Sequence, residues 1–259
     1  MPEILIAIPT KNRSDILPLP LYSLFQQTHQ LFDVLIYDSS DAPITDNYIN
    51  RQMIDLLQIH KGIEVKHIRD MKNRSLALAR HYLINYAYCR KYHYLLMLDD
   101  DVILTPDCLE KLYWEIKTNK DIIFTCGCAL DVNNALGHSD YSVDIKHNFD
   151  GLSDWAIPHY YYDNKLKKDI RTVTGGFHYL IDMTKINFAM LDKLTTQLAK
   201  LHGMPCEDIM LEYWLTNGKY KGRLITDALV YHFPSTAQPR DWYNVTRKLQ
   251  ERISKTGEL

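Results

Sequence analysis

The chain has 259 residues, of which 46% are hydrophobic and 24% are charged, a composition typical of a soluble globular protein with one sizeable core. The net charge of −2 gives no overall attraction to nucleic acids or membranes, and no apolar run is long enough to span a bilayer. The five irregularly spaced cysteines and a start without a basic, signal-like region favour a cytoplasmic protein with reduced thiols.

Strands and helices are predicted to alternate through the first half of the chain. Apolar, β-rich runs predict strands, and apolar residues at helical spacing predict helices. The predicted strands cover residues 4–8, 34–37, 63–68, 95–98 and 122–130, and the predicted helices cover residues 19–27, 47–59, 75–89 and 109–116. This alternation is typical of an α/β fold, with a mostly parallel, Rossmann-like sheet flanked by helices.

After about residue 130 the pattern becomes irregular. Residues 131–155 are rich in Asn, Asp, Gly, Ser and His, which favours loops and irregular strands. Helices are predicted at 186–201, 207–216 and 241–254, and a strand at 224–231. Because no linker or repeat is visible, we expect one domain, divided into a nucleotide-binding half (1–130), an acceptor half (131–235) and a terminal helix (236–259).

Three acids, Asp99, Asp100 and Asp101, follow the apolar run Leu95–Leu98 directly. Adjacent carboxylates at the end of a buried strand repel one another and lose hydration unless a cation lies among them. Oxygen ligands clustered in this way suit Mg²⁺ or Mn²⁺. The alternative is a solvated acidic turn, with Thr105 capping the next helix. The triplet alone leaves both interpretations open.

Polar residues end two other predicted strands. Thr10, Asn12 and Arg13 follow the first strand, and Asp38 ends the second. The carboxyl ends of parallel strands meet at one edge, where α/β folds bind ligands. The loop 11–15 contains no glycine, which argues against a dinucleotide fold or a phosphate-binding glycine loop. A diphosphate at this edge would therefore need a bridging cation.

Two later features have both a functional and an ordinary interpretation. Glu207 and Asp208 open a predicted helix. A carboxylate there could act as a catalytic base, or it could simply interact favourably with the helix dipole. His232 follows a predicted strand and is either a metal ligand or a hydrogen-bonded core histidine.

Taken together, these motifs resemble glycosyltransferase family 2 and its relatives with the GT-A fold. The resemblance rests on Ile8–Arg13, Asp38, the run from Asn73 to Arg80, the DxD-like Leu98–Asp101 and the ED-like Cys206–Asp208. Gly175-Gly176 resembles a glycine pair near the acceptor site, and His232 lies where some relatives have a third metal ligand. The match covers residues 3–130 well and 170–235 loosely.

The resemblance implies inverting transfer of a sugar from a nucleoside diphosphate sugar, expected to be UDP-linked, to an acceptor hydroxyl. Asp208 would be the catalytic base. The implied metal ligands for Mn²⁺ or Mg²⁺ are Asp99, Asp101 and His232, with Asp99 also near the ribose. The implied donor-binding residues are Pro9, Thr10, Asn12, Arg13, Asp38, Asn73, Arg80, Asp99 and Asp100. The implied acceptor-binding residues are Trp155, Gly175, Gly176 and Glu207.

The acceptor itself is open. A saccharide or glycan is the family's default, and Trp155, Tyr160–Tyr162 and His178 could form a wall for sugar rings. The same aromatics near a basic cluster, Lys165–Arg171, also suit nucleic acid, such as a modified base in DNA. A solvated basic loop with structural tyrosines is the third interpretation.

Two other classes of protein compete with a glycosyltransferase. A nucleotidyltransferase would share the sheet and the metal acids, but it would carry a glycine- and arginine-rich loop after the first strand. A carbohydrate-binding protein would need neither the acid triplet nor the helix-opening acid. Both acidic features are present in this chain.

Overall fold

The computed structural model describes residues 2–72, 75–131, 167–170, 178–200, 211, 215 and 220–233. Its strands are β1 Ile4–Thr10, β2 Phe32–Asp38, β3 Val65–Arg69, β4 Tyr94–Leu98, β5 Val102–Leu104, β6 Ile122–Asp131, β7 Lys167–Ile170, β8 His178–Asp182 and β9 Lys221–His232. Its α-helices are α1 Pro18–Phe25, α2 Tyr48–Asp55, α3 Leu76–Cys89, α4 Cys108–Thr118 and α7 Phe188–Lys200. Within these residues, no helix is both long and apolar enough to cross a bilayer.

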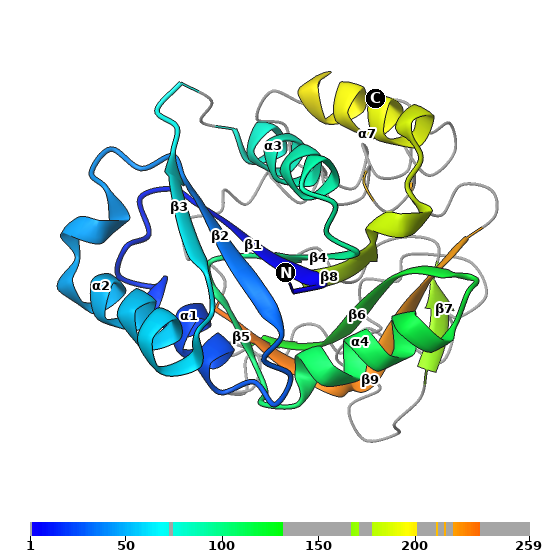
Figure 1. The fold of residues 1–259 in the computed structure, drawn as a ribbon, viewed down its shortest axis with the longest axis horizontal. Helices are drawn as coiled ribbons and strands as arrows, with labels where there is room; N and C mark the ends of the chain where they lie inside the picture. Colours follow the sequence, from blue (N-terminus) through cyan, green and yellow to red (C-terminus); the bar gives the residue numbers. More distant parts are fainter. Residues whose placement is uncertain are drawn as a thin grey trace.

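All nine described strands belong to one mixed sheet (Figure 1). The order is β3-β2-β1-β4-β8-β6-β9-β5, and β7 pairs with β9. Strands β1 to β4 are mutually parallel, and β8 runs against both β4 and β6. Because β6 and β9 are parallel while β5 and β7 oppose β9, six of the nine strands share one direction. The prediction of a mixed, mostly parallel sheet is confirmed.

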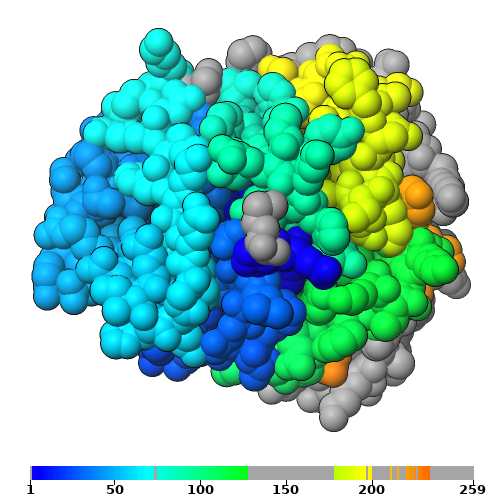
Figure 2. All heavy atoms as spheres, viewed as in Figure 1, coloured from blue at the N-terminus to red at the C-terminus, as the bar shows by residue number. Residues whose placement is uncertain are grey.

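Both faces of the sheet are buried, as the continuous apolar runs of the central strands require. Along β1, Leu5 and Ala7 join one core cluster, whereas Ile4, Ile6 and Ile8 join the other, as expected from the two-residue period of a strand. The first cluster is covered by α3 and α7, and the second by α1, α2 and α4 (Figures 1 and 2). The helices therefore leave the strand ends as the place where polar groups can gather.

The structure differs from the predicted elements in several places, including β7 and β8, for which no strand bounds were predicted. The sequence analysis missed β5, three residues that pair with β9 more than a hundred positions later and are too few to show a pattern. The predicted helix 47–59 is α2 followed by a π-helical turn, Leu56–His60. Helix α4 begins at Cys108 with Asp107 as its cap, so the cap at Thr105 that the alternative interpretation of the acidic turn included is wrong.

Other predicted elements lie partly or wholly outside the described residues. Of the predicted helix 207–216, only Leu211 and Leu215 are described, and both are buried in the α3–α7 core cluster. The predicted terminal helix 241–254 and most of the segment 131–170 also lie outside.

Candidate active site

The carboxyl ends of β1, β2 and β4 meet at one edge of the sheet, as the sequence predicts. Thr10, the last residue of β1, is the register partner of Asp38, the last residue of β2. On the other side, the Thr10 hydroxyl donates a 2.7 Å hydrogen bond to Oδ2 of Asp100, just beyond β4. The parallel register thus connects residues 90 positions apart in the chain.

Arg13 is the cation among the acids that follow β4. Its Nη1 donates to Oδ1 of Asp100 at 2.9 Å and to Oδ2 of Asp101 at 2.6 Å. Both aspartates are 5% exposed. Burial lowers the pKa of Arg13, but the two carboxylates outweigh burial and raise the pKa above its usual value. The expected position of Arg13 beside the donor phosphates stays a prediction, and in the structure Arg13 contacts these two acids.

Asp100 shows how closely the acids are packed. Burial raises the pKa of Asp100 to about 6, with a further contribution from Asp101, although Arg13 and the Thr10 hydroxyl favour the ionised form. Asp100 belongs to the donor-binding set predicted from sequence. In the structure its two oxygens face Thr10 and Arg13.

A second arginine holds Asp99. Arg80 on α3 is 2% exposed, and its Nη1 donates to the Tyr179 hydroxyl at 2.8 Å. Its Nη2 lies 3.1 Å from Oδ1 of Asp99. Arg80, predicted beside the diphosphate, therefore pairs with an acid of the triplet. The sequence argument that the three acids need a metal to neutralise them is incomplete, because Arg13 and Arg80 already supply positive charge.

Of the three predicted metal ligands, the structure brings Asp101 and His232 together. Nε2 of His232 lies 3.6 Å from Oδ1 of Asp101. His232 ends β9, where it pairs with Val102, and the Phe233 amide donates to the Asp101 carbonyl at 2.9 Å. Asp99 is turned toward Arg80 instead. The antiparallel β5–β9 pairing therefore creates this juxtaposition.

These two side chains fit a hard or borderline divalent cation. Ligands about 2.1 Å from one ion lie about 3–4 Å apart, which accommodates their 3.6 Å separation. Carboxylate and imidazole suit Mn²⁺, and carboxylate suits Mg²⁺. In the described part of the chain, no group of three or more His, Cys, Asp or Glu side chains is placed to hold a metal ion. Water and substrate oxygens commonly complete the coordination of Mg²⁺.

Asp38 has structural partners. It is 0% exposed, and its carboxylate accepts bonds from the Ser40 amide (2.9 Å), the Ile44 amide (3.1 Å) and Nε2 of His67 (3.1 Å). Burial raises the pKa of Asp38, but these hydrogen bonds outweigh burial, so the pKa falls to about 2. The predicted contact with a nucleobase stays a prediction. The observed effect of Asp38 is to shape the loop after β2.

Asn12 joins that loop to the loop after β1. Its backbone N–H donates to Oγ of Ser40 at 2.8 Å. Its side chain donates to the Asp41 carboxylate and accepts from the Asp41 backbone N–H. Its φ of 57° lies in the left-handed region, which Asn tolerates better than most residues. Pro9 precedes Thr10 as a buried residue of β1. The two loops are thus held as one unit beside the acids.

The suggestion that His178 lines a sugar-binding wall is wrong. His178 is 0% exposed on β8, and its Nε2 accepts the Gly127 amide at 2.9 Å. Burial lowers the pKa of His178 to about 4. Gly127 is required here, because a Cβ would lie 2.2 Å from the Ala228 carbonyl oxygen of β9. His178 therefore belongs to the packing between β8, β6 and β9.

Sequence reasoning missed Tyr179 and His67, the partners of Arg80 and Asp38. Both lie inside strands, where an aromatic residue or a histidine gives no functional signal by itself. The remaining predicted site residues lie outside the described part of the chain: Asn73, Trp155, Gly175, Gly176, Glu207 and Asp208.

Comparisons with known proteins address the family and the fold. The family model described as glycosyl transferase family 2 matches residues 5–182. No curated protein matches the chain. Among solved structures, S. aureus TarS is 15% identical with a TM-score of 0.57, covering 99% of this chain and 40% of TarS.

Two further structures are similar. The mannosyltransferase PcManGT from Pyrobaculum calidifontis, in complex with GDP-Man and Mn²⁺, is 12% identical with a TM-score of 0.62, covering 98% of this chain and 64% of PcManGT. GalNAc-T7 with UDP, GalNAc and Mn²⁺ is 13% identical with a TM-score of 0.64, covering 97% of this chain and 48% of GalNAc-T7.

The chain thus spans 40–64% of the length of these three proteins. At these identities the likeness concerns the fold, and the mixed sheet with its flanking helices is the GT-A architecture. The family model covers more than half of the chain, including β1, β2, β4 and the acids. The chain therefore belongs to glycosyl transferase family 2.

Proposed function

We propose that the protein transfers a sugar from a nucleoside diphosphate sugar, expected to be UDP-linked, to a hydroxyl of a saccharide or glycan, with inversion and with dependence on a divalent cation. The observation that carries this proposal is the buried Asp101 facing His232 at the carboxyl edge of the sheet. Membership of the family supports the reaction class. Two similar structures, with GDP-Man and Mn²⁺ and with UDP, GalNAc and Mn²⁺, support the choice of donor and metal.

Asp101 and His232 would hold Mn²⁺ or Mg²⁺. When bound, such an ion supplies positive charge that stabilises the departing diphosphate. Asp99, 22% exposed at its side chain beside Arg80, is the acid of the triplet left to face the ribose. The Asn12–Asp41 loop pair, shaped by Asp38, would receive the nucleobase. Each strand end thereby has a separate part of the donor to bind.

Asp208 is the proposed catalytic base. In an inverting displacement, the acceptor oxygen forms a bond to the anomeric carbon as the bond to the diphosphate oxygen breaks. Asp208 would accept the acceptor's proton, and the leaving group departs as a nucleoside diphosphate. Glu207, Trp155, Gly175 and Gly176 remain the proposed acceptor-side residues on the basis of the resemblance.

Family membership favours this reaction over nucleotidyl transfer and over carbohydrate binding without catalysis. Within the described part of the chain, no observation favours a nucleic-acid acceptor, so a modified base in DNA is an outcome to test rather than a second proposal. A cytoplasmic location remains a prediction from the cysteine pattern.

The test is an assay of donor turnover. The protein is incubated with Mn²⁺ and a panel of nucleotide sugars, and release of nucleoside diphosphate is measured with and without saccharide acceptors or hydroxylated DNA. We expect turnover with at least one nucleotide sugar and none with a nucleoside triphosphate alone. Turnover of the triphosphate with release of pyrophosphate would contradict the proposal.

The base is tested by Asp208→Asn. Because general base catalysis contributes roughly 10²–10⁴-fold, we expect the transfer rate to fall by about a thousandfold while nucleotide binding persists. Asp55→Asn, at an exposed residue that ends α2, is the matched control. A normal transfer rate in the Asp208→Asn variant would disprove the base assignment.

A further inference from the structure

Arg13 connects the acids in a way that neither the family nor the sequence motif specifies. A single nitrogen, Nη1, donates to both Asp100 and Asp101, at 2.9 and 2.6 Å. Arg13 lies on the loop after β1, and its side chain is 33% exposed, whereas those of the two aspartates are 7% and 6% exposed. Arg13 thus reaches inward to two buried carboxylates across 87 and 88 positions of sequence.

Within each aspartate of this network, the two carboxylate oxygens face different partners. Oδ2 of Asp100 accepts from Thr10, and Oδ1 accepts from Arg13. Oδ2 of Asp101 accepts from Arg13, which turns Oδ1 toward Nε2 of His232 at 3.6 Å. These hydrogen bonds therefore form one continuous network, from Thr10 through Asp100 and Arg13 to Asp101. We call these four residues the Arg13 clamp.

We infer that Arg13 is a positioning residue for the cation. It holds Asp101 by Oδ2 so that Oδ1 faces His232, and Asp100 anchors Arg13 through its bond to Thr10. Partners behind a metal ligand fix its orientation and are commonly worth 10–100-fold in metal affinity. This inference rests on the proposed function, and it changes the role expected for both Arg13 and Asp100 from donor contact to support of Asp101.

If Arg13 competed with the cation, its removal would change the metal affinity in the opposite direction. If Arg13 merely occupied the place of the metal, an incoming ion would have to displace it, and removing Arg13 would tighten metal binding. The geometry points away from displacement, because Arg13 and His232 contact different oxygens of Asp101. The sign of the change in affinity therefore separates a positioning residue from a competing cation.

The experiment titrates the full chain with Mn²⁺ alone and measures free Mn²⁺ by electron paramagnetic resonance. Omitting nucleotide removes any direct contact between Arg13 and phosphate from the measurement. We expect Arg13→Gln to raise the Kd for Mn²⁺ about 10- to 100-fold. Arg13→Lys should restore part of the affinity, because one nitrogen makes both contacts in the wild type.

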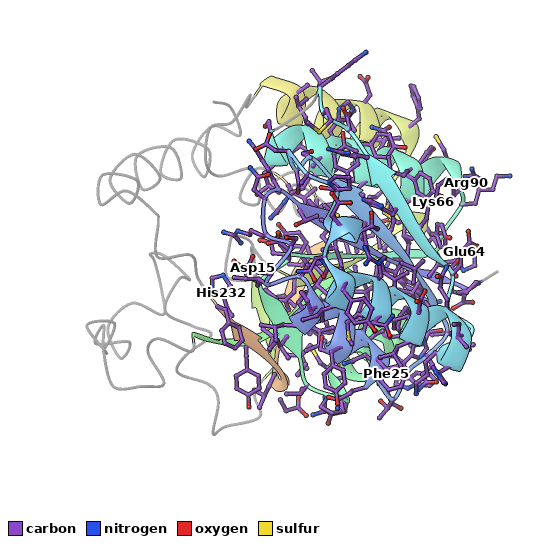
Figure 3. All side chains as sticks on the ribbon, turned by 90° about the vertical axis from the view of Figure 1, so that its left-hand side faces the viewer. Asp15, Phe25, Glu64, Lys66, Arg90 and His232 are labelled. Carbon is purple, nitrogen blue, oxygen red and sulfur yellow. The ribbon has the colours of Figure 1, made fainter. Side chains whose placement is uncertain are left out.

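Arg90→Gln is the matched control. Arg90 is exposed at the end of α3, and Figure 3 shows it on the opposite side of the molecule from His232. The same chemical change there should leave the Kd unchanged. A Kd for Arg13→Gln equal to or below that of the wild type would overturn the inference.

Thermal unfolding in EDTA separates failure of the clamp from failure of the metal site. Arg13→Gln should lower Tm in the wild-type background and lower it much less in an Asp100→Asn/Asp101→Asn background, because the two negative charges that pair with Arg13 are gone. Equal loss of Tm in both backgrounds would overturn the clamp. A wild-type protein that binds no Mn²⁺ would instead refute the metal dependence of the proposed function, and this Tm comparison would still decide the clamp.

Discussion

Asp38 and Asp101 lie at the same edge of the sheet, after β2 and β4, but they are held in different ways. Asp38 is 0% exposed and receives two backbone amides from its own loop and one imidazole from β3. Asp101 is 5% exposed and is paired with the side chain of Arg13 and faced by His232. Asp38 is held chiefly by backbone amides of its own loop, whereas Asp101 is held by side chains from distant parts of the sequence.

These different surroundings suit the two aspartates to different roles: Asp38 fixes the conformation of a loop, and Asp101 is placed to bind an ion. Hydrogen bonds from the backbone cannot be exchanged without refolding the loop, so Asp38 sets the course of the chain beside the ligand. Side-chain charges around Asp101 can be supplemented by an ion that uses its second oxygen. We therefore expect loss of Asp38 to appear mainly in stability, and loss of Asp101 mainly in metal binding and catalysis.

The largest expected effect is that of Asp101→Asn on catalysis. Removing the negative charge should weaken the bound cation and its stabilisation of the leaving group, which is worth several kcal/mol, or roughly a thousandfold in rate. The transfer rate and the Kd for Mn²⁺ are the measurements, with Asp55→Asn as the exposed control. A variant that binds Mn²⁺ normally would place the cation elsewhere.

Next in size is the effect of Asp38→Ala on stability. The substitution leaves two buried amides and one imidazole without their acceptor, and unsatisfied buried groups cost about 1–3 kcal/mol each. We expect the free energy of unfolding in urea at pH 7 to fall by about 3 kcal/mol. If stability is unchanged while nucleotide binding is lost, Asp38 is a ligand contact and the comparison with Asp101 is wrong.

The smallest effect concerns His178, which pairs with Leu98 immediately before the acids. Burial lowers the pKa of His178 to about 4 from the ordinary 6.5. At pH values between these two, the unfolded chain binds a proton on His178 and the folded chain does not. Stability from this residue is therefore complete above pH 6.5 and is lost as pH falls. Between pH 7 and pH 5 the loss should be about 2 kcal/mol.

The measurement for His178 is the difference in the free energy of unfolding between wild type and His178→Gln at pH 7 and pH 5. Glutamine retains an acceptor for the Gly127 amide but does not titrate, and taking the difference cancels the other titrating groups. The wild type should lose about 2 kcal/mol more than the variant. Parallel pH curves would show that folding does not lower the pKa of His178.

The positions of site residues could be predicted from the sequence where these residues directly follow a predicted strand. The apolar run before Asp99, Asp100 and Asp101 and the polar residues after β1 and β2 indicated one shared edge, because parallel strands end together. His232 was also placed near the acids correctly, although the strand β5 that brings β9 to them was missed. Its three residues give no periodicity.

Side-chain pairing could not be predicted in the same way. Sequence reasoning placed Arg13 and Arg80 beside a diphosphate, which stays a prediction, and gave no sign that Arg13 pairs with Asp100 and Asp101, or Arg80 with Asp99. Both pairings depend on distances between loops and helices that no local pattern encodes. The need of the acids for positive charge was correctly inferred, but the sequence did not specify that protein side chains would supply part of it.

The role of the cation is tested most sharply by calorimetric titration of the protein with UDP and with GDP, in Mn²⁺ and in EDTA. We expect binding of at least one nucleoside diphosphate in Mn²⁺ and its loss in EDTA and in Asp101→Asn. Binding of equal strength in EDTA would contradict the claim that the edge beyond β4 holds the diphosphate through a divalent cation.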